Sequence, residues 1–201
     1  MSSKKLTIVA GTQNQHKIEE ILAYLKFDHI ILKTLNDYDG IPDVEETGET
    51  FEENALIKAM AYHDLVHLPV FADDSGLRVD ALNGMPGVYS ARYAGEDVTY
   101  LDNNKKLLKE LSNIPDEQRT AEFVSTICYL DDSGARYFTG VTKGIITREF
   151  KGDKGFGYDP VFYIPEIGKT YAELTMQEKN RISHRGKALA QFKAFLEKLP
   201  A

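Results

Sequence analysis

Two pairs of adjacent carboxylates are the first residues whose types and spacing could do chemistry. Glu45-Glu46 precedes Thr47-Gly48, and Asp73-Asp74 runs into Ser75-Gly76. Adjacent acids repel each other unless a cation offsets their charge, and carboxylate oxygens suit a hard divalent cation such as Mg²⁺. With one cysteine and five histidines that show no paired ligand spacing, zinc is disfavoured. The acids predict an all-oxygen metal site. The plainer alternatives are an exposed acidic loop and an Asx-turn.

A polar segment between a predicted strand and a predicted helix has the composition of a phosphate site. Backbone N–H groups and the positive end of a helix dipole face an anion at such a position, and a lysine adds a full charge. The pattern is not a P-loop, because G-x-x-x-x-G-K-[ST] is absent. The alternative is that the asparagine only caps the helix and the lysine is solvated. The segment reads Thr12-Gln13-Asn14-Gln15-His16-Lys17.

A glycine-rich segment further along the chain carries two aromatic residues and an acid. Gly155 and Gly157 allow close approach of the backbone to a ligand, and Phe156 or Tyr158 could stack on a nucleobase. The alternative is a turn with both rings packed in the core. Asp159 completes the segment.

Cations gather around the predicted start of the last helix. Lys179 precedes Ser183-His184-Arg185-Gly186, which would place positive charge and a ring donor at a helix N-terminus. This indicates a second anion or base-edge site, although a charged first turn is usually a solvated cap. Lys58, on an earlier helix, would likewise ordinarily be a surface lysine.

The elements that must position these residues form an α/β pattern. Apolar runs predict strands over 6–10 and 29–35 around a helix over 15–26, a strand–helix–strand unit. A capping box from Thr50 to Glu53 starts a helix to Val66, and a strand over 69–72 then ends at the Asp pair. Ligands bind at the carboxyl ends of strands in open α/β sheets. Further predictions are a helix over 100–111, a hairpin of strands 122–130 and 136–150 turning at 131–134, a strand over 161–164 and a C-terminal helix from 183.

Composition limits the class of protein. The chain has 201 residues, a net charge of −7 and 42% hydrophobic residues, which fits one domain over 1–201 and excludes disordered, collagen-like and coiled-coil chains. The acidic balance disfavours general nucleic-acid binding. No long uncharged apolar run predicts a membrane span, and the short apolar stretch near the N-terminus is not a secretory signal. Together with the single cysteine, these features predict a cytoplasmic protein.

The order of the motifs along nearly the whole chain resembles the inosine/xanthosine triphosphate pyrophosphatase family of house-cleaning purine nucleotide hydrolases. Each motif is weak alone, and their sequence is specific. They are Thr12-x-Asn14-x-x-Lys17, Glu46-x-Gly48-x-Thr50-Phe51-x-Glu53-Asn54-Ala55, Ala72-Asp-Asp-Ser-Gly-Leu77, Pro86-Gly-Val-Tyr-Ser-Ala-Arg-Tyr93, Gly155-Phe-Gly-Tyr-Asp-Pro160 and Ser183-His-Arg-Gly186.

The resemblance implies a reaction and a fold. It implies Mg²⁺-dependent hydrolysis of ITP, dITP and XTP to the monophosphate and pyrophosphate. It also implies a homodimer of elongated α/β subunits, each with a mixed sheet, flanking helices and two lobes around a central cleft. Glu46 and Asp74 would bind the metal, with Asp74 also accepting a proton from the attacking water. Substrate contacts would come from Thr12, Gln13, Asn14, Gln15, His16, Lys17, Lys58, Ser75, Phe156, Gly157, Tyr158, Asp159, Lys179, His184 and Arg185.

One position departs from the family pattern, and two other functions stay open. Many members have glycine where this chain has Gln13, which changes the backbone freedom of the phosphate segment. A related pyrophosphatase acting on modified pyrimidine or GTP-like nucleotides is one alternative, and a nucleotide sensor without catalysis is another. The 6-oxo group of hypoxanthine is an acceptor, so Arg185, His184 or a loop N–H would be its donor.

Overall fold

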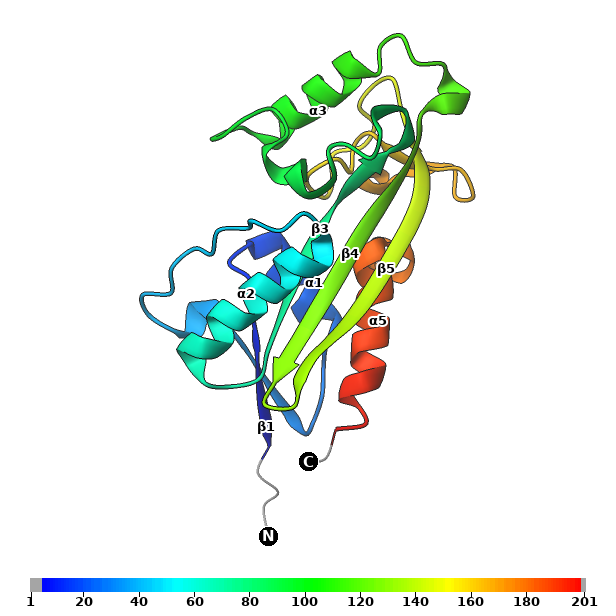
Figure 1. Cartoon of the computed structure of the whole chain (residues 1–201). Coiled ribbons are helices and arrows are strands. Elements are labelled where there is room, and N and C mark those ends of the chain that lie inside the picture. The colour runs from blue at the N-terminus through cyan, green and yellow to red at the C-terminus, as the bar shows by residue number, and fades with distance from the viewer. Residues whose placement is uncertain (1–4, 200–201) are drawn as a thin grey trace. The chain divides into compact units, whose positions relative to one another are not determined.

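A seven-stranded mixed sheet with flanking helices carries the fold (Figure 1). The structure is a computed structural model that describes residues 5–199. The strand order is β2-β1-β3-β4-β5-β6-β7, with β1 parallel to β2 and β3, and β6 antiparallel to β5 and β7. The strands are β1 (Leu6–Ala10), β2 (Ile30–Thr34), β3 (Val70–Val79), β4 (Thr120–Asp131), β5 (Gly134–Ile146), β6 (Phe162–Ile164) and β7 (Lys169–Thr170).

The helices confirm most of the predicted pattern. The capping box is present, since Thr50 accepts from the N–H of Glu53 and the Glu53 carboxylate accepts from Thr50. Among the described residues, no helix is long and apolar enough to cross a membrane. The α-helices are α1 (Gln15–Tyr24), α2 (Phe51–Val66), α3 (Tyr100–Glu110), α4 (Met176–Ile182) and α5 (His184–Leu196).

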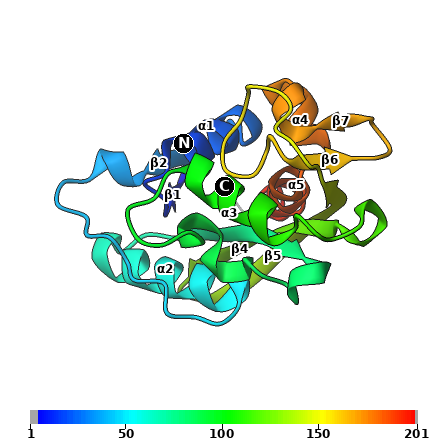
Figure 2. The ribbon, with the colours of Figure 1, turned by 90° about the horizontal axis from the view of Figure 1, so that it is seen from above.

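The first of two compact units holds the parallel part of the sheet. It comprises residues 1–74, 125–140 and 187–201. Successive side chains of a strand point to opposite faces. Ile8 and Phe71 therefore pack with α1 and α5, whereas Val9 and Val70 pack with α2. Figure 2 shows α1 and α2 on opposite sides of β1, so each face of the strands has its own helix.

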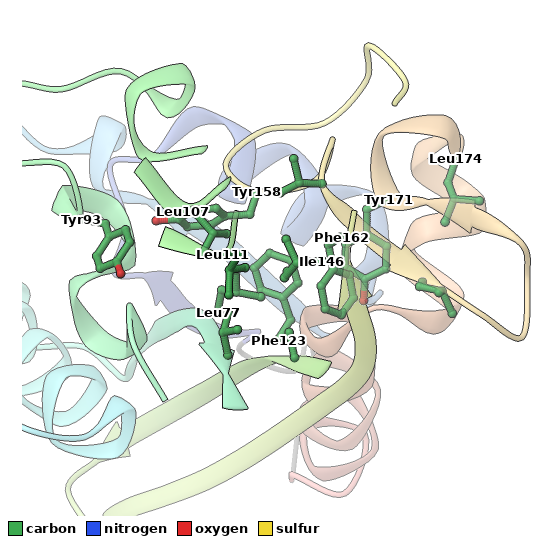
Figure 3. Packing of buried hydrophobic residues seen from close by; sticks show 14 residues of the cluster. Leu77, Tyr93, Leu107, Leu111, Phe123, Ile146, Tyr158, Phe162, Tyr171 and Leu174 are labelled. Carbon is green, nitrogen blue, oxygen red and sulfur yellow. The ribbon is translucent and has the colours of Figure 1, made fainter. Parts of the chain in front are cut away.

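The second unit has a separate aromatic core. It comprises residues 75–124 and 141–186, including α3, β6, β7, α4 and the 3₁₀ helix η3 (Gly87–Arg92). Leu107 of α3 and Leu111, the residue that caps its C-terminus, pack with Leu77, and Phe123 contacts Phe162 edge to face (Figure 3). Apolar burial on the facing sides of α3 and the strands explains why these elements hold together.

The prediction that a strand ends at Ala72 is wrong. β3 runs on to Val79, so Asp73 and Asp74 lie inside the strand. The Asp-Asp-Ser-Gly composition suggested a turn, but Leu77 and Val79 beyond it are completely buried and keep the chain extended. The neighbouring strand β1 does end near this point: its last residue, Ala10, pairs with Phe71 of β3. The carboxylates thus lie just past the carboxyl end of β1, rather than of their own strand.

Candidate active site

The segment after β1 turns into α1 through its own polar side chains. The hydroxyl of Thr12 accepts from the N–H of Asn14 at 3.2 Å, and Oδ1 of Asn14 accepts from the N–H of Lys17 at 3.2 Å. Asn14 is therefore the N-cap of α1. The exposed Gln13 donates to the Ile41 carbonyl at 3.2 Å and so contacts the loop that carries Glu46. Of the remaining predicted residues here, Gln15 bonds Glu19 on its own helix and His16 is exposed.

Asp73 and Asp74 serve opposite faces of β3. Asp73 lies on the α1 face, where its Oδ2 is 3.1 Å from Nζ of Lys17, which also donates to the Asp73 carbonyl at 3.4 Å. Asp74 lies on the α2 face, with its Oδ1 3.6 Å from Nζ of Lys58. Strand alternation separates the two acids, and each carboxylate lies close to a lysine. The separation and the two lysines reduce the repulsion expected between adjacent acids.

Lys58 brings Glu46 and Asp74 together. Its Nζ is 2.6 Å from Oε1 of Glu46, and Lys58 is only 8% exposed. Burial opposes its charged form, but Asp74 and Glu46 outweigh burial and raise the pKa of Lys58. Burial, reinforced by Glu46 and opposed by Lys58, raises the pKa of Asp74 above its ordinary value. A carboxylate of raised pKa is a stronger base than an exposed one.

Asn54 is a site residue to which sequence reasoning assigned no role. Its Nδ2 donates to Oδ2 of Asp74 at 3.1 Å, and its Oδ1 accepts from the N–H of Gly48 at 2.7 Å. Asn54 is completely buried. A Cβ on Gly48 would lie 2.7 Å from that Oδ1, so only glycine lets the acidic loop approach. The signal in the sequence was a polar residue on the inward face of α2, directly after its capping box.

The second unit builds a separate set around the loop 155–159. Oδ2 of Asp159 accepts from the Phe156 N–H at 2.9 Å and from Nζ of Lys179 at 2.7 Å. Nζ of Lys179 also lies 4.7 Å from the centre of the Phe156 ring, and the guanidinium of Arg185 lies 5.7 Å from it. The loop thus presents an aromatic ring beside two cations and a buried carboxylate.

The remaining predicted residues of this set divide between the loop and the core. Arg185 donates to the hydroxyl of Ser75 at 2.9 Å, which brings these two predicted residues together. The His184 ring stacks on Phe123 at 4.5 Å between centroids, and is buried. Tyr158 points into the core, where its hydroxyl donates to the Ser90 carbonyl at 2.9 Å (Figure 3). Its ring is therefore not placed to stack on a base, whereas that of Phe156 is partly exposed.

The predicted residues fall into two sets, each inside one compact unit. The phosphate set comprises Thr12 to Lys17, Glu46, Lys58 and Asp74, joined by Asn54 and Asp73. The nucleoside set comprises Ser75, Phe156 to Asp159, Lys179, His184 and Arg185. The boundary between the units falls at the peptide bond from Asp74 to Ser75.

The phosphate set has the donor chemistry of a magnesium site. Within residues 5–199 there is no cluster of three or more histidines, cysteines and acids that could hold a metal. Mg²⁺ usually takes one or two carboxylates and completes its shell with water and substrate phosphates. Glu46 and Asp74, which meet at one lysine, fit that requirement without a third protein ligand.

Fold and site together define an α/β protein with an acid–lysine cluster beside the N-terminus of α1. Several known proteins are similar to this chain over nearly its full length. A dITP/XTP pyrophosphatase from Geobacter sulfurreducens is 50% identical over 190 residues, covering 94% of this chain and 96% of that protein. One from Thermoanaerobacter sp. (strain X514) is 48% identical over 193 residues, covering 96% and 98%. The solved structure of a HAM1 protein from Coxiella burnetii has a TM-score of 0.90 at 43% identity, covering 96% and 100%.

The family model named Ham1 family matches residues 8–195. The chain belongs to the Ham1 family. The resemblance drawn from the six ordered motifs is thereby confirmed, and so is the mixed sheet with flanking helices.

Proposed function

We propose that this chain hydrolyses dITP, ITP and XTP to the nucleoside monophosphate and pyrophosphate. The observation that carries the proposal is the acid–lysine cluster, in which Lys58 lies 2.6 Å from Glu46 and 3.6 Å from Asp74. Relatives at 48–50% identity over nearly the full chain carry the name dITP/XTP pyrophosphatase. The names of these relatives support the substrate class. The acid–lysine cluster supports hydrolysis of a phosphoanhydride bond.

The phosphate set supplies what attack on an α-phosphate requires. Asp74, buried and of raised pKa, orients a water molecule and accepts its proton. Lys17 and Lys58 stabilise the charge on the departing pyrophosphate. Glu46 and Asp74 would hold Mg²⁺. When bound, the ion would polarise phosphoryl oxygens and neutralise their charge.

The nucleoside set supplies recognition of a deaminated purine. Phe156 offers a ring face that Lys179 and Arg185 flank. Arg185, a cation with several N–H donors, suits the 6-oxo acceptor of hypoxanthine and xanthine better than the 6-amino donor of adenine. A homodimer and a cytoplasmic location stay predictions.

A panel of triphosphates tests the substrate class. Pyrophosphate release from dITP, XTP, dATP, dCTP and dUTP is measured with Mg²⁺ and with a chelator. The expected result is fast release from dITP and XTP that needs Mg²⁺, with little from the others. Faster release from the pyrimidine nucleotides would overturn the purine assignment.

Asp74→Asn tests the chemistry and separates an enzyme from a sensor. Loss of the base should lower kcat by about 10²–10⁴-fold. Binding of dITP, followed by calorimetry, should persist. If wild type binds dITP without releasing pyrophosphate, the chain is a sensor. If the variant turns over like wild type, the role of Asp74 is wrong.

A further inference from the structure

Asn104 of α3 is bonded to the loop 155–159, here called the nucleoside loop, although it is not one of the predicted site residues. It is 1% exposed, and its Nδ2 donates to the carbonyls of Tyr100 and Gly157, both at 2.7 Å. The Tyr100 bond anchors the amide to its own helix, and the Gly157 bond joins the helix to the loop. The ring of Tyr100 lies 6.0 Å from that of Phe156. α3 thus contacts the loop through two side chains one helical turn apart.

The bond to Gly157 acts at the centre of the loop. Gly157 has a φ of +61°, a left-handed conformation that glycine adopts at no steric cost. The backbone of a glycine rotates more freely than that of its neighbours. A hydrogen bond to the Gly157 carbonyl therefore restrains the loop at its most flexible position. Tyr158 follows directly and is anchored through its hydroxyl to Ser90.

Fixing the Gly157 carbonyl also fixes an N–H donor. A trans peptide is planar, so the Gly157 C=O and the Tyr158 N–H point in opposite directions. With the carbonyl held by α3, that N–H is directed away from α3. The N–H of Phe156 donates to Asp159, and that of Asp159 donates to Phe156. Within the part of the chain that the structure describes, the Tyr158 N–H donates to no acceptor.

We propose that Asn104 is a positioning residue for base recognition: it orients the Tyr158 N–H as a donor to the 6-oxo group of the substrate. The inference rests on the proposed function. It gives the Tyr158 backbone a role in discrimination while its ring serves the core. An oxo group satisfies this donor, whereas a 6-amino group presents a second donor and leaves both unpaired.

The adjacent residue supplies a matched control. Asn103 is 2% exposed, donates to the Ala91 carbonyl at 2.9 Å and accepts from the Ala94 N–H at 2.7 Å. It has the same side chain, helix and degree of burial as Asn104, but its hydrogen bonds go to residues 91–94 rather than to the loop. A leucine at either position keeps the branching at Cγ and removes the hydrogen-bonding groups.

The experiment compares Asn104→Leu with Asn103→Leu and wild type. Steady-state kinetics with ITP and ATP give KM, kcat and the ITP/ATP ratio. Inhibition by inorganic triphosphate, which has no base, reports on the phosphate set alone. Thermal unfolding of each variant reports the loss of stability. If Asn104→Leu does not fold, Asn104→Ser replaces it. The serine side chain keeps a hydroxyl donor at this buried position, but the donor lies closer to the helix backbone than Nδ2 of asparagine does.

For Asn104→Leu, we expect KM for ITP to rise and the ITP/ATP ratio of kcat/KM to fall, each by about tenfold. A tenfold change is about what the loss of one good hydrogen bond to the substrate would cause. Inhibition by inorganic triphosphate should not change. Asn103→Leu should lose comparable stability and keep the ITP/ATP ratio. An unchanged ratio in Asn104→Leu, or an equal fall in both variants, would overturn the role of Asn104. A wild-type protein inactive on ITP would instead overturn the proposed function, so the two failures are distinguishable.

Discussion

The side chain of Asn54 ties the acidic loop to the predicted base. It donates to Asp74 and accepts from Gly48, two residues after Glu46. A residue that supports a metal ligand in this way usually costs about 10–100-fold in activity or metal affinity when it is replaced. Asn54→Ala should lower kcat by that factor. The measurement is pyrophosphate release from dITP at saturating Mg²⁺.

Asn54→Asp is the companion variant. It keeps the shape but replaces the donor to Asp74 with a second carboxylate, so its rate should fall at least as far. A wild-type rate in Asn54→Ala, in protein shown to be folded by circular dichroism, would contradict the positioning role.

Gly155 leaves room for the Asp159 carboxylate. A Cβ there would lie 2.0 Å from Oδ2 of Asp159, the atom that accepts from Lys179. Gly155→Ala should therefore raise KM for dITP as well as lower stability. Gly168→Ala is the control, because φ is +73° there against +74° at Gly155, and beyond its chain neighbours the added Cβ would lie no closer than 3.8 Å to another residue, at the Tyr163 hydroxyl.

Both alanines carry the cost of a left-handed residue, about 1–2 kcal/mol. Only Gly155→Ala displaces Asp159. The comparison of KM for dITP isolates that displacement. Equal KM values in the two variants would show that the carboxylate is not needed to bind the nucleotide.

At the scale of elements, three capping boxes of the second unit hold ionised acids. Hydrogen bonds from Thr99 lower the pKa of Asp102, those from Thr170 lower the pKa of Glu173, and those from Thr175 lower the pKa of Glu178. A depressed pKa in the folded state stabilises the protein above the ordinary pKa of the unfolded chain. That stability is lost as the pH falls through the folded pKa.

Thermal stability should therefore decline on acidification from about pH 5 to pH 3. The variant Asp102→Asn, Glu173→Gln, Glu178→Gln should melt lower than wild type at pH 7 and show a flatter decline. Melting curves at a series of pH values check this. An equally steep decline in the triple variant would assign the acid sensitivity to other groups.

Sequence patterns predicted elements well where local signals were strong. The apolar run over 6–10 predicted the observed limits of β1, and the capping box at Thr50 predicted the start of α2. β7 has two residues and α4 has seven, too short for periodicity to reveal, and the sequence patterns predicted neither. The structure shows a capping box between Thr175 and Glu178 at the start of α4. The length of β3 depended on burial of Leu77 and Val79, which is a tertiary effect.

The candidate site was predictable to the level of residue types, and less so to the level of contacts. A lysine such as Lys58 is usually solvated, and only its neighbours Glu46 and Asp74 explain why it is buried. Likewise the two rings of the loop look alike in sequence. Packing against Leu107 and Ser90 decides that Tyr158 belongs to the core. Such choices depend on partners distant in the chain.

At the scale of the whole molecule, the net charge of −7 does not oppose an anionic substrate. Lys17, Lys58 and Lys179 each lie within about 3.1 Å of a carboxylate. These pairs keep cations buried and oriented at positions where a phosphate or a base would meet them. The acidic excess includes Glu46 and Asp74, which suit a divalent cation. We therefore expect these local pairs, rather than the overall charge, to determine which small ligand binds, while the acidic balance disfavours nucleic acid.

The central claim is cleavage between the α- and β-phosphates of a deaminated purine nucleotide. The most direct test is product analysis of dITP incubated with the protein and Mg²⁺, by chromatography of the nucleotides together with separate assays for pyrophosphate and orthophosphate. We predict dIMP and pyrophosphate in equal amounts, with dATP hydrolysed far more slowly. Release of dIDP and orthophosphate, or equal rates for dITP and dATP, would contradict it.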